Sequence, residues 1–471
     1  MGDYLPHTDE EVAAMLAFLG LSDLDELFAA VPQALRLAGG LDLAEGEPEP
    51  DVLGHMDALA RANSAADLVC FAGAGAYDHE VPPVVRALAG RSEFVTAYTP
   101  YQPEVAQGVL QAVFEYQTMI ARLAGLPVAN ASLYDGASAL VEAVNLGAAA
   151  SGRGTVWVSS GIHPHWRACL RTFARGSGHR IVEIPLTDGV TAWPDDPAGI
   201  REAPASGSTG AAREAPGVLV AGYPNYLGCL EDLAAVRRLA DAHGATMVVA
   251  ADPVSSGILR SAGEWGADVV VGEGQAFGTA LSFGGPYLGL FCCTLSQVRR
   301  LPGRLVGETV DVEGRRAYVT TLRAREQDIR REKATSNVCT NQTLMAVTAA
   351  VQLGWLGTEG LFEVALRCAR GTRYLRDAAL GIDGVTPLTG ATPVVRELAL
   401  RTTVPARTVV DRMASEGFLA GVALADLVGD DGDGSADADA VEHGLLVAVT
   451  ERRTLAEINA YLVALDKAVR P

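Results

Sequence analysis

The stretch "GADVVVGEGQAFGTALSFGGPYLGLF" covers Gly266 to Phe291 and says most about the architecture of the chain. Its first part is an apolar run typical of a buried strand, and its second part is a turn rich in glycine. The stretch contains no lysine, and the whole chain of 471 residues has only Lys333 and Lys467. Any chemistry that requires a lysine therefore has two candidates in this chain.

Similar short runs, rich in β-branched residues, occur before and after this stretch, with helical patterns between several of them. Because these runs are apolar throughout rather than alternating, they favour central strands of a sheet covered on both faces. The pattern predicts an open α/β sheet of mostly parallel strands. The expected strands are "TVWVSS" (155–160), "RIVEIPL" (180–186), "GVLVAGYP" (217–224), "ATMVVAADP" (245–253), "ADVVVGEG" (267–274) and "YLGLFCC" (287–293).

The chain is expected to have three parts, an N-terminal helical arm (1–69), a large α/β domain (70–345) and a smaller α+β domain (346–471). In the arm, Thr8 and Glu11 have the spacing of a capping box, and the helical pattern that follows ends at Gly20. A second helical pattern, "SDLDELFAAVP", stops at Pro32. The C-terminal part predicts a long helix, short strands at "VVRELALRT" and "GLLVAVT", and a final helix.

The composition excludes several classes of function. A net charge of −20 and a pI near 4.8 argue against a nucleic-acid partner. The basic stretch "TLRAREQDIRREK" (321–333) also contains acids and is expected to form a solvated helix face. Seven scattered cysteines without a CxxC pair favour a reduced, cytoplasmic protein without a disulfide framework or zinc site. The acidic N-terminus is not typical of a signal peptide, and no apolar run is long enough to cross a membrane.

Two polar segments are expected to be surface loops. The first, 201–216, is of low complexity. The second, "DDGDGSADADAVE" (430–442), has acidic residues at the spacing of a calcium-binding loop, but Ala436 stands where that loop requires glycine. We therefore predict no metal site there. The residues at that spacing are Asp431, Asp433, Ser435, Asp437, Asp439 and Glu442.

Three short segments could hold a flat, phosphorylated ligand. Exposed N–H groups at a helix start suit a phosphate, and "YDGAS" precedes an alanine-rich helix. A carboxylate at the carboxyl end of a parallel strand, as at Asp252, could pair with a pyridinium nitrogen. His163 or His165 could stack on a planar ring. Each has a structural alternative, namely a helix cap, a turn aspartate and turn histidines. The helix-start residues are Asp135, Gly136, Ala137 and Ser138.

The order of these segments, together with five longer motifs, resembles the amino-terminal half, or separate first subunit, of the glycine decarboxylase P-protein of the glycine cleavage system. The resemblance covers nearly the whole chain. It implies the aspartate-aminotransferase-like fold (fold type I) of pyridoxal-phosphate enzymes. Besides the opening stretch, the motifs are "FAGAGAYDHEVPPVV" (71–85), "SEFVTAYTPYQPEVAQGVLQAVFEYQTMIARLAG" (92–125), "NASLYDGASALVEA" (130–143) and "REQDIRREKATSNVCTNQTLMA" (325–346).

The resemblance also gives a meaning to the missing lysine. In the carboxy-terminal half of the family, the corresponding turn carries a His-Lys pair, and counting back from "GGP" (284–286) places the lysine position at Gln275. Glutamine lacks the deprotonatable amine that covalent attachment of the cofactor needs. Lys333 lies far along the chain in a charged passage. The resemblance therefore implies that Asp135 to Ser138, His163, Asp252 and Gln275 outline a vestigial pocket, and that a partner subunit anchors pyridoxal 5'-phosphate.

Active sites of this fold lie at a dimer interface, so the resemblance implies that this chain supports its partner's site. Aromatic and amide side chains there could orient a small amino acid or a lipoyl arm; alternatively, tyrosines and prolines only rigidify the interface. The candidates are Tyr98, Thr99, Tyr101, Gln102 and Glu104 in "AYTPYQPE", Tyr77, Asp78 and His79 in "GAYDH", and Lys333 and Asn337 in "KATSNVCTNQ".

The implied reaction is the decarboxylation of glycine, with transfer of the remaining aminomethyl group to the lipoyl disulfide of H-protein, which is reduced. The implied partners are the second P-protein subunit and lipoylated H-protein. Two alternatives remain open at this point. One is a relative specific to another amino acid or carrier protein, and the other is a non-catalytic structural or regulatory subunit.

Overall fold

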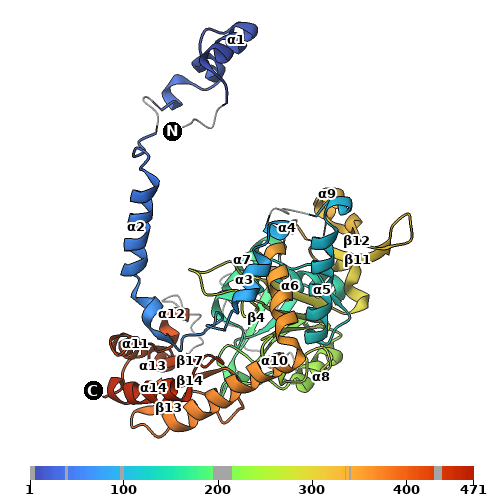
Figure 1. Ribbon diagram of the computed structural model, residues 1–471. Coiled ribbons are helices and arrows are strands. Elements are labelled where there is room, and N and C mark those ends of the chain that lie inside the picture. The colour runs from blue at the N-terminus through green and yellow to red at the C-terminus, as the bar shows by residue number, and fades with distance from the viewer. Residues whose placement is uncertain are drawn as a thin grey trace. The chain divides into compact units, whose positions relative to one another are not determined.

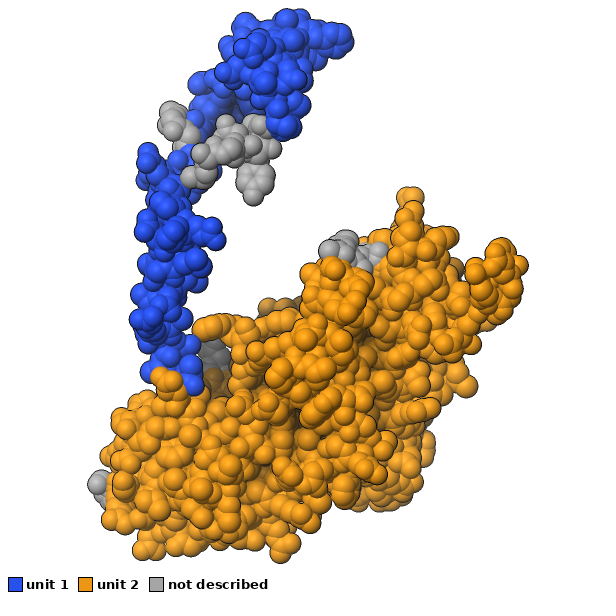
Figure 2. Space-filling view, in the orientation of Figure 1, with its two compact units in different colours: residues 1–66 blue, residues 67–471 orange. Residues whose placement is uncertain are grey.

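The fold is that of a computed structural model, which describes residues 6–37, 41–95, 100–194, 215–334, 336–338, 341–428 and 438–470. The chain divides into two compact units, residues 1–66 and 67–471, which have different colours in Figure 2. Within the described parts of the chain, no helix combines the length and the apolar composition that a bilayer span requires.

The first unit contains α1 (Asp9–Leu19) and α2 (Glu49–Ala62), and none of its described residues is buried. The predicted capping box is confirmed, because the Thr8 hydroxyl accepts from the Glu11 N–H and the Glu11 carboxylate accepts from the Thr8 N–H. The second predicted helix is instead a 3₁₀ helix (Leu24–Phe28). A segment this short forms few α-helical hydrogen bonds, which makes an α-helix marginal.

The second unit is built on a seven-stranded sheet with the order β2-β10-β9-β8-β7-β3-β4. Strand β10 is antiparallel to both neighbours, and the other pairs are parallel. All six strands expected from the sequence are present, and β2 joins them at the edge. The strands are β2 (Val128–Ala129), β3 (Thr155–Ser159), β4 (Arg180–Ile184), β7 (Val218–Tyr223), β8 (Thr246–Ala251), β9 (Val269–Glu273) and β10 (Gly289–Cys293).

Helices cover both faces of this sheet, as the apolar runs predict (Figure 1). One face packs on α5, α8 and the start of α10, and the other packs on α6 and α7. Alternate residues of β7 divide between the two cores: Leu219 belongs to the first and Val220 to the second. The helices are α3 (Pro83–Ala89), α4 (Ser92–Val95), α5 (Gln107–Ala124), α6 (Gly136–Ser151), α7 (Pro164–Ser177), α8 (Leu233–His243) and α10 (Thr343–Ala379).

A four-stranded sheet, β13-β14-β17-β16, forms the C-terminal part and has its own core. The long helix α10 links it to the large sheet, and at Gly357 the backbone has φ 61° and ψ −173°, so α10 is two helical limbs that meet at a kink. The elements are β13 (Val385–Pro387), β14 (Glu397–Thr402), α11 (Ala406–Ser415), β16 (Val422–Ala423), α12 (Leu424–Val428), α13 (Ala438–His443), β17 (Gly444–Ala448) and α14 (Leu455–Ala468).

Three small two-stranded sheets complete the fold. The pairs are β1 (Val69–Cys70) with β15 (Phe418–Leu419), β5 (Leu186–Thr187) with β6 (Val190–Thr191), and β11 (Leu305–Val310) with β12 (Arg316–Thr321).

The basic stretch 321–333 does not form one helix. It forms a 3₁₀ turn, the four-residue α9 (Gln327–Arg330) and another 3₁₀ turn, because Leu322 and Arg331 have positive φ values of 56° and 53°. Most of the predicted loop 201–216 and residues 430–437 of the acidic segment lie outside the described residues; Asp439 and Glu442 lie on α13.

Candidate functional site

A small cavity lies where the carboxyl ends of the parallel strands face the start of β14. Its volume is about 110 Å³. Carboxyl ends of parallel strands are the usual place for ligands in this class of fold. The cavity brings together four residues singled out from the sequence, Tyr77, His163, Asp252 and Gln275, and three charged residues that were not, Glu273, Arg396 and Glu397.

Gln275, at the expected lysine position, is fully engaged with the backbone. Its side chain is buried, with the residue 2% exposed. The amide oxygen accepts a hydrogen bond from the Tyr77 N–H (3.0 Å), and the amide nitrogen donates to the carbonyls of Tyr77 (3.2 Å) and Thr279 (2.6 Å). Gln275 therefore ties the segment around Tyr77 to the turn after β9.

The start of helix α6 does not line this cavity but contacts Glu273 and Trp166, which do. The Asp135 side chain caps the helix by accepting from the Ser138 N–H at 2.7 Å and from the Ser138 hydroxyl at 3.2 Å. Gly136 and Ala137 form the start of the first turn. These residues form the helix start that the phosphate hypothesis requires.

A carboxylate of the chain itself occupies this helix start. The Gly136 N–H donates to one oxygen of Glu273 at 2.9 Å. The other Glu273 oxygen accepts from two backbone N–H groups beyond β9, at 3.0 and 2.9 Å. The Trp166 ring also covers the turn, since a Cβ at Gly136 would lie 2.3 Å from it. An anion at the start of α6 would therefore have to displace Glu273.

Glu273 is expected to make stability depend on pH. Burial raises the pKa of its carboxyl group from 4.5 to about 7, so the native state holds a proton that the unfolded chain releases above pH 4.5. Its contribution to stability is complete below pH 4.5 and is lost as the pH rises to about 7, by up to about 3 kcal/mol. Urea unfolding between pH 4.5 and 8 should show this loss, and Glu273→Gln should reduce it. Parallel pH profiles for the two proteins would contradict the assignment.

Asp252, the expected partner of a pyridinium nitrogen, is paired with a side chain of its own chain. It accepts from the Arg396 guanidinium at 2.8 Å, from the Ser255 hydroxyl at 2.5 Å and from the Val254 N–H at 3.2 Å. Arg396 is 6% exposed and lies 3.4 Å from the centroid of the Tyr77 ring. A planar cation therefore already lies between Asp252 and an aromatic ring.

His163 lines the cavity at the start of α7. Its Nε2 lies 2.9 Å from the Ala74 carbonyl, and its Nδ1 accepts from the His165 N–H at 3.2 Å. An acceptor at one nitrogen and a donor at the other fix a neutral ring with the proton on Nε2. Burial, with a smaller effect of His165, lowers the pKa of His163 to about 4. The ring is therefore uncharged at neutral pH.

The residues present do not fit pyridoxal phosphate. Ligand pockets usually have volumes of about 300–1,000 Å³, and this cavity has about 110 Å³. The Glu273 carboxylate occupies the start of α6, and Arg396 is already paired with the Asp252 carboxylate. Gln275 has no amine with which the cofactor could form a covalent bond. Each place at which the cofactor would attach is thus satisfied from within the chain.

The remaining predicted residues fall into two groups. Asp78 pairs with Arg452 and Arg453, and His79 pairs with Glu451, so both connect to the C-terminal part. The others lie away from the cavity or outside the described residues. Tyr101, Gln102, Glu104, Lys333 and Asn337 are exposed, while Tyr98 and Thr99 are not described.

Sequence reasoning missed Glu273, Arg396 and Glu397. The Glu397 carboxylate accepts from the Ala74 N–H at 2.6 Å and from the Tyr77 hydroxyl at 2.7 Å, and burial raises its pKa to about 6. The sequence does contain an indication of these residues. Glu273 lies at the end of an otherwise apolar predicted strand, and Arg396 and Glu397 lie near the start of another. Charged residues are rarely buried unless they are paired, so their positions predict partners but not which ones.

Comparison with known proteins places this geometry in a family. The family described as "Glycine cleavage system P-protein" matches residues 2–385. "Probable glycine dehydrogenase (decarboxylating) subunit 1" of Desulforamulus reducens is 44% identical over 457 residues, 97% of each chain. The protein of the same name from Moorella thermoacetica is 44% identical over 462 residues, 98% of each chain.

Solved structures agree with these relatives. The crystal structure of a glycine decarboxylase (P-protein) of the glycine cleavage system, in inhibitor-bound form, has a TM-score of 0.86 and 43% identity, and it covers 99% of this chain and 100% of its own. Sphingosine-1-phosphate lyase of Burkholderia pseudomallei has a TM-score of 0.62 and 15% identity, with 93% of this chain and 94% of its own covered. The fold type I architecture and the resemblance found in the sequence are both confirmed. The chain belongs to the P-protein family of the glycine cleavage system.

Proposed function

We propose that this chain is subunit 1 of a glycine dehydrogenase (decarboxylating), a cytoplasmic oxidoreductase that works as a complex of two subunit types. Glycine loses CO2, and its aminomethyl group becomes attached to one sulfur of the lipoyl arm of H-protein while the disulfide is reduced. The described cysteines of this chain are free thiols, which suits a reducing compartment.

One observation supports the assignment of the cofactor to the second subunit: each group of this chain that could hold pyridoxal phosphate is already paired within the chain. The Glu273 carboxylate lies at the start of α6, and Arg396 pairs with Asp252 at 2.8 Å. The lysine that holds the cofactor therefore belongs to the second subunit, and pyridoxal phosphate supplies the electron sink for decarboxylation there.

This chain contributes surface groups to its partner's site in the proposal. Tyr101 is 44% exposed, and its hydroxyl accepts from Arg304 at 2.6 Å. The guanidinium groups of Arg304 and Arg323 lie 4.4 and 5.8 Å from the Tyr101 ring centroid. An aromatic ring close to two cations suits an anionic group, such as the carboxylate of glycine, at its edge. Gln102 and Glu104 are exposed beside it.

Reconstitution tests the proposal. The chain and the second subunit are assayed singly and together for exchange of labelled CO2 into glycine, and are then reduced with borohydride in the presence of pyridoxal phosphate. We expect exchange only with both chains, and labelled lysine only on the second subunit. Activity of this chain alone, or label at Lys333 or Lys467, would overturn the proposal. Full exchange activity of the second subunit alone would favour a purely structural role for this chain.

A further variant tests the surface contribution. Tyr101→Phe should lower exchange by about tenfold, because it removes the hydroxyl that Arg304 orients. Tyr374→Phe is the matched control: Tyr374 is 43% exposed and makes one side-chain hydrogen bond, to Asn459 at 2.7 Å. Equal rates for the two variants would remove the Tyr101 hydroxyl from the reaction.

A further inference from the structure

A second cavity lies beside the kink of α10 and shares one lining residue, Ala276, with the cavity described above. Its volume is about 300 Å³, the lower end of the range typical of small-molecule sites. Both limbs of α10 line it, because the left-handed backbone at Gly357 turns one limb away from the other. The turn after β9 contributes Phe277, and the C-terminal part contributes Glu451.

One side chain that lines the cavity has a buried polar atom without a partner among the described residues. Gln352 is 4% exposed, and its amide nitrogen donates to the Glu80 carbonyl at 3.3 Å. Its amide oxygen has no hydrogen-bond partner among the described residues. A buried acceptor left unsatisfied costs roughly 1–3 kcal/mol. A hydrogen-bond donor on a bound molecule would remove that cost.

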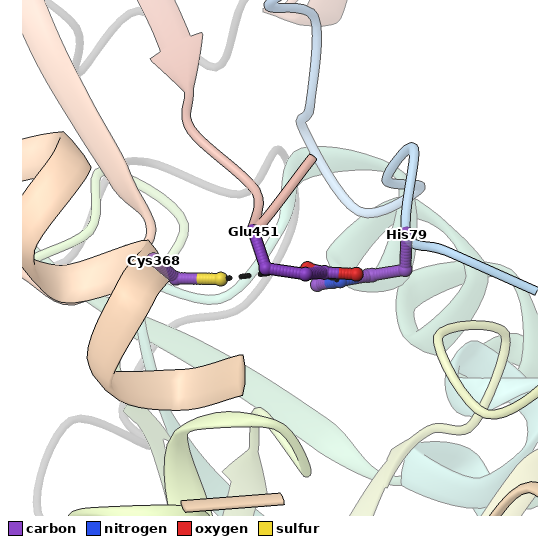
Figure 3. A group of neighbouring side chains, drawn as sticks. All are labelled: His79, Cys368 and Glu451. Carbon is purple, nitrogen blue, oxygen red and sulfur yellow. Dashed lines mark hydrogen bonds and ion pairs between the residues drawn. The ribbon is translucent and has the colours of Figure 1, made fainter. Parts of the chain in front are cut away.

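The interior of the cavity also carries a net negative charge. Glu451 lies against His79 (Figure 3) and accepts from its Nδ1 at 2.6 Å. It also accepts from the Glu80 N–H at 2.8 Å. Although burial opposes its charge, the hydrogen bonds from His79 and from the Glu80 N–H lower the pKa of the Glu451 carboxyl group. Because His79 Nε2 faces an Arg396 N–H at 2.5 Å, the proton of a neutral His79 lies on Nδ1. In either form of His79, the three carboxylates that line the cavity, Glu80, Glu363 and Glu451, outnumber its cations.

A metal ion is a poor candidate for this charge. His79, Cys368 and Glu451 have ligand atoms within 4.8 Å of one another. A metal on His79 Nδ1 would move the proton to Nε2, where it would oppose the Arg396 N–H. Burial also raises the pKa of the Cys368 thiol well above its usual range, so it remains protonated. The geometry favours an organic cation.

The remaining walls suit an apolar body. Phe277 and Leu361 are buried, and Trp355, 56% exposed, lies at the rim. Glu363 and Arg367 pair with each other at 2.7 Å. Indole rings attract ammonium groups by cation–π interaction. We propose that this cavity binds a small primary ammonium compound with an apolar body, whose N–H groups donate to Gln352 and face Glu451.

The proposed ligand would contact one end of a hydrogen-bonded chain of side chains. Glu451 contacts His79, His79 contacts Arg396, and Arg396 pairs with Asp252 in the first cavity. Three contacts therefore connect the second cavity to the site that faces the ends of the large sheet. The binding itself does not depend on the reaction proposed above.

The test uses three probes of nearly equal size, butylammonium, butanol and butyrate, added to the full chain alone and in complex with the second subunit. Trp355 fluorescence is the readout, and Trp355→Phe identifies the reporter. We expect saturable binding of butylammonium with a dissociation constant of roughly a millimolar, which five heavy atoms can provide. Butanol should bind about tenfold more weakly, and butyrate should not bind.

Variants then assign the contact. Gln352→Met should weaken butylammonium binding by about tenfold. Gln297→Met is the matched control and should leave binding unchanged. The Gln297 amide oxygen is also buried without a partner among the described residues, but Gln297 does not line this cavity. Equal binding of butyrate and butylammonium would overturn the proposal. So would loss of binding in the complex, or a Gln352→Met variant that folds and binds like wild type.

Discussion

Arg396→Met is expected to lower the free energy of unfolding by about 3–5 kcal/mol, the usual cost of removing one member of a buried ion pair. Arg396 is 6% exposed, contacts Asp252 at 2.8 Å and lies over Tyr77. Without the guanidinium, the Asp252 carboxylate remains partly buried with hydrogen bonds from Ser255 and Val254 but no counter-charge. Urea denaturation at pH 7 measures the loss.

The double variant Asp252→Asn/Arg396→Met separates this charge effect from lost packing. Replacing both charges removes the unpaired carboxylate, so the double variant should be more stable than Arg396→Met alone, with a coupling free energy of about 2 kcal/mol. A cost below about 1 kcal/mol for the single variant, or strictly additive effects, would show that the pair contributes little.

Gln275→Lys is expected to leave the chain unable to attach pyridoxal phosphate. The introduced amine would enter a cavity of about 110 Å³ in which Glu273 already occupies the start of α6 and Arg396 already pairs with Asp252. Borohydride reduction followed by peptide mass spectrometry should find no label at position 275. The second subunit, treated in parallel, should be fully labelled.

Two comparisons make this result interpretable. Lys333 and Lys467 are both exposed, so they report the background of nonspecific labelling. Gln275→Met breaks the same hydrogen bonds to Tyr77 and Thr279 without adding an amine, so it measures the loss of stability on its own. Stoichiometric label at position 275 would mean that the internal pairs do not block the cofactor.

Much of the large sheet could be predicted because its strands are short, apolar throughout and separated by clear helical patterns. The strands β3 and β8, for example, lie where "TVWVSS" and "ATMVVAADP" place them. Gln275, at the position that the resemblance assigns to the lysine, lies in the turn after β9 and lines the cavity. These features depend on residues close together along the chain.

The state of the cavity could not be predicted, because it depends on pairs that are distant in sequence. Arg396 reaches Asp252 across 144 positions, and Glu273 reaches Gly136 across 137. The local pattern around "VVVGEG" does not predict which N–H groups will donate hydrogen bonds to the Glu273 carboxylate. The same limit applies to Gln352. Only the arrangement of the two limbs of α10 in space shows that its amide oxygen has no hydrogen-bond partner among the described residues.

The internal pairing of Asp252 with Arg396 also bears on how such a chain can evolve. A lineage that regained a lysine at position 275 would gain no cofactor while Glu273 and Arg396 stayed in place, and loss of Arg396 first would cost stability. Several substitutions would have to arrive together before selection could reward any of them. Under the proposed function, the dependence of this chain on the second subunit is thus a one-way step, and the two genes are expected to be kept or lost as a pair.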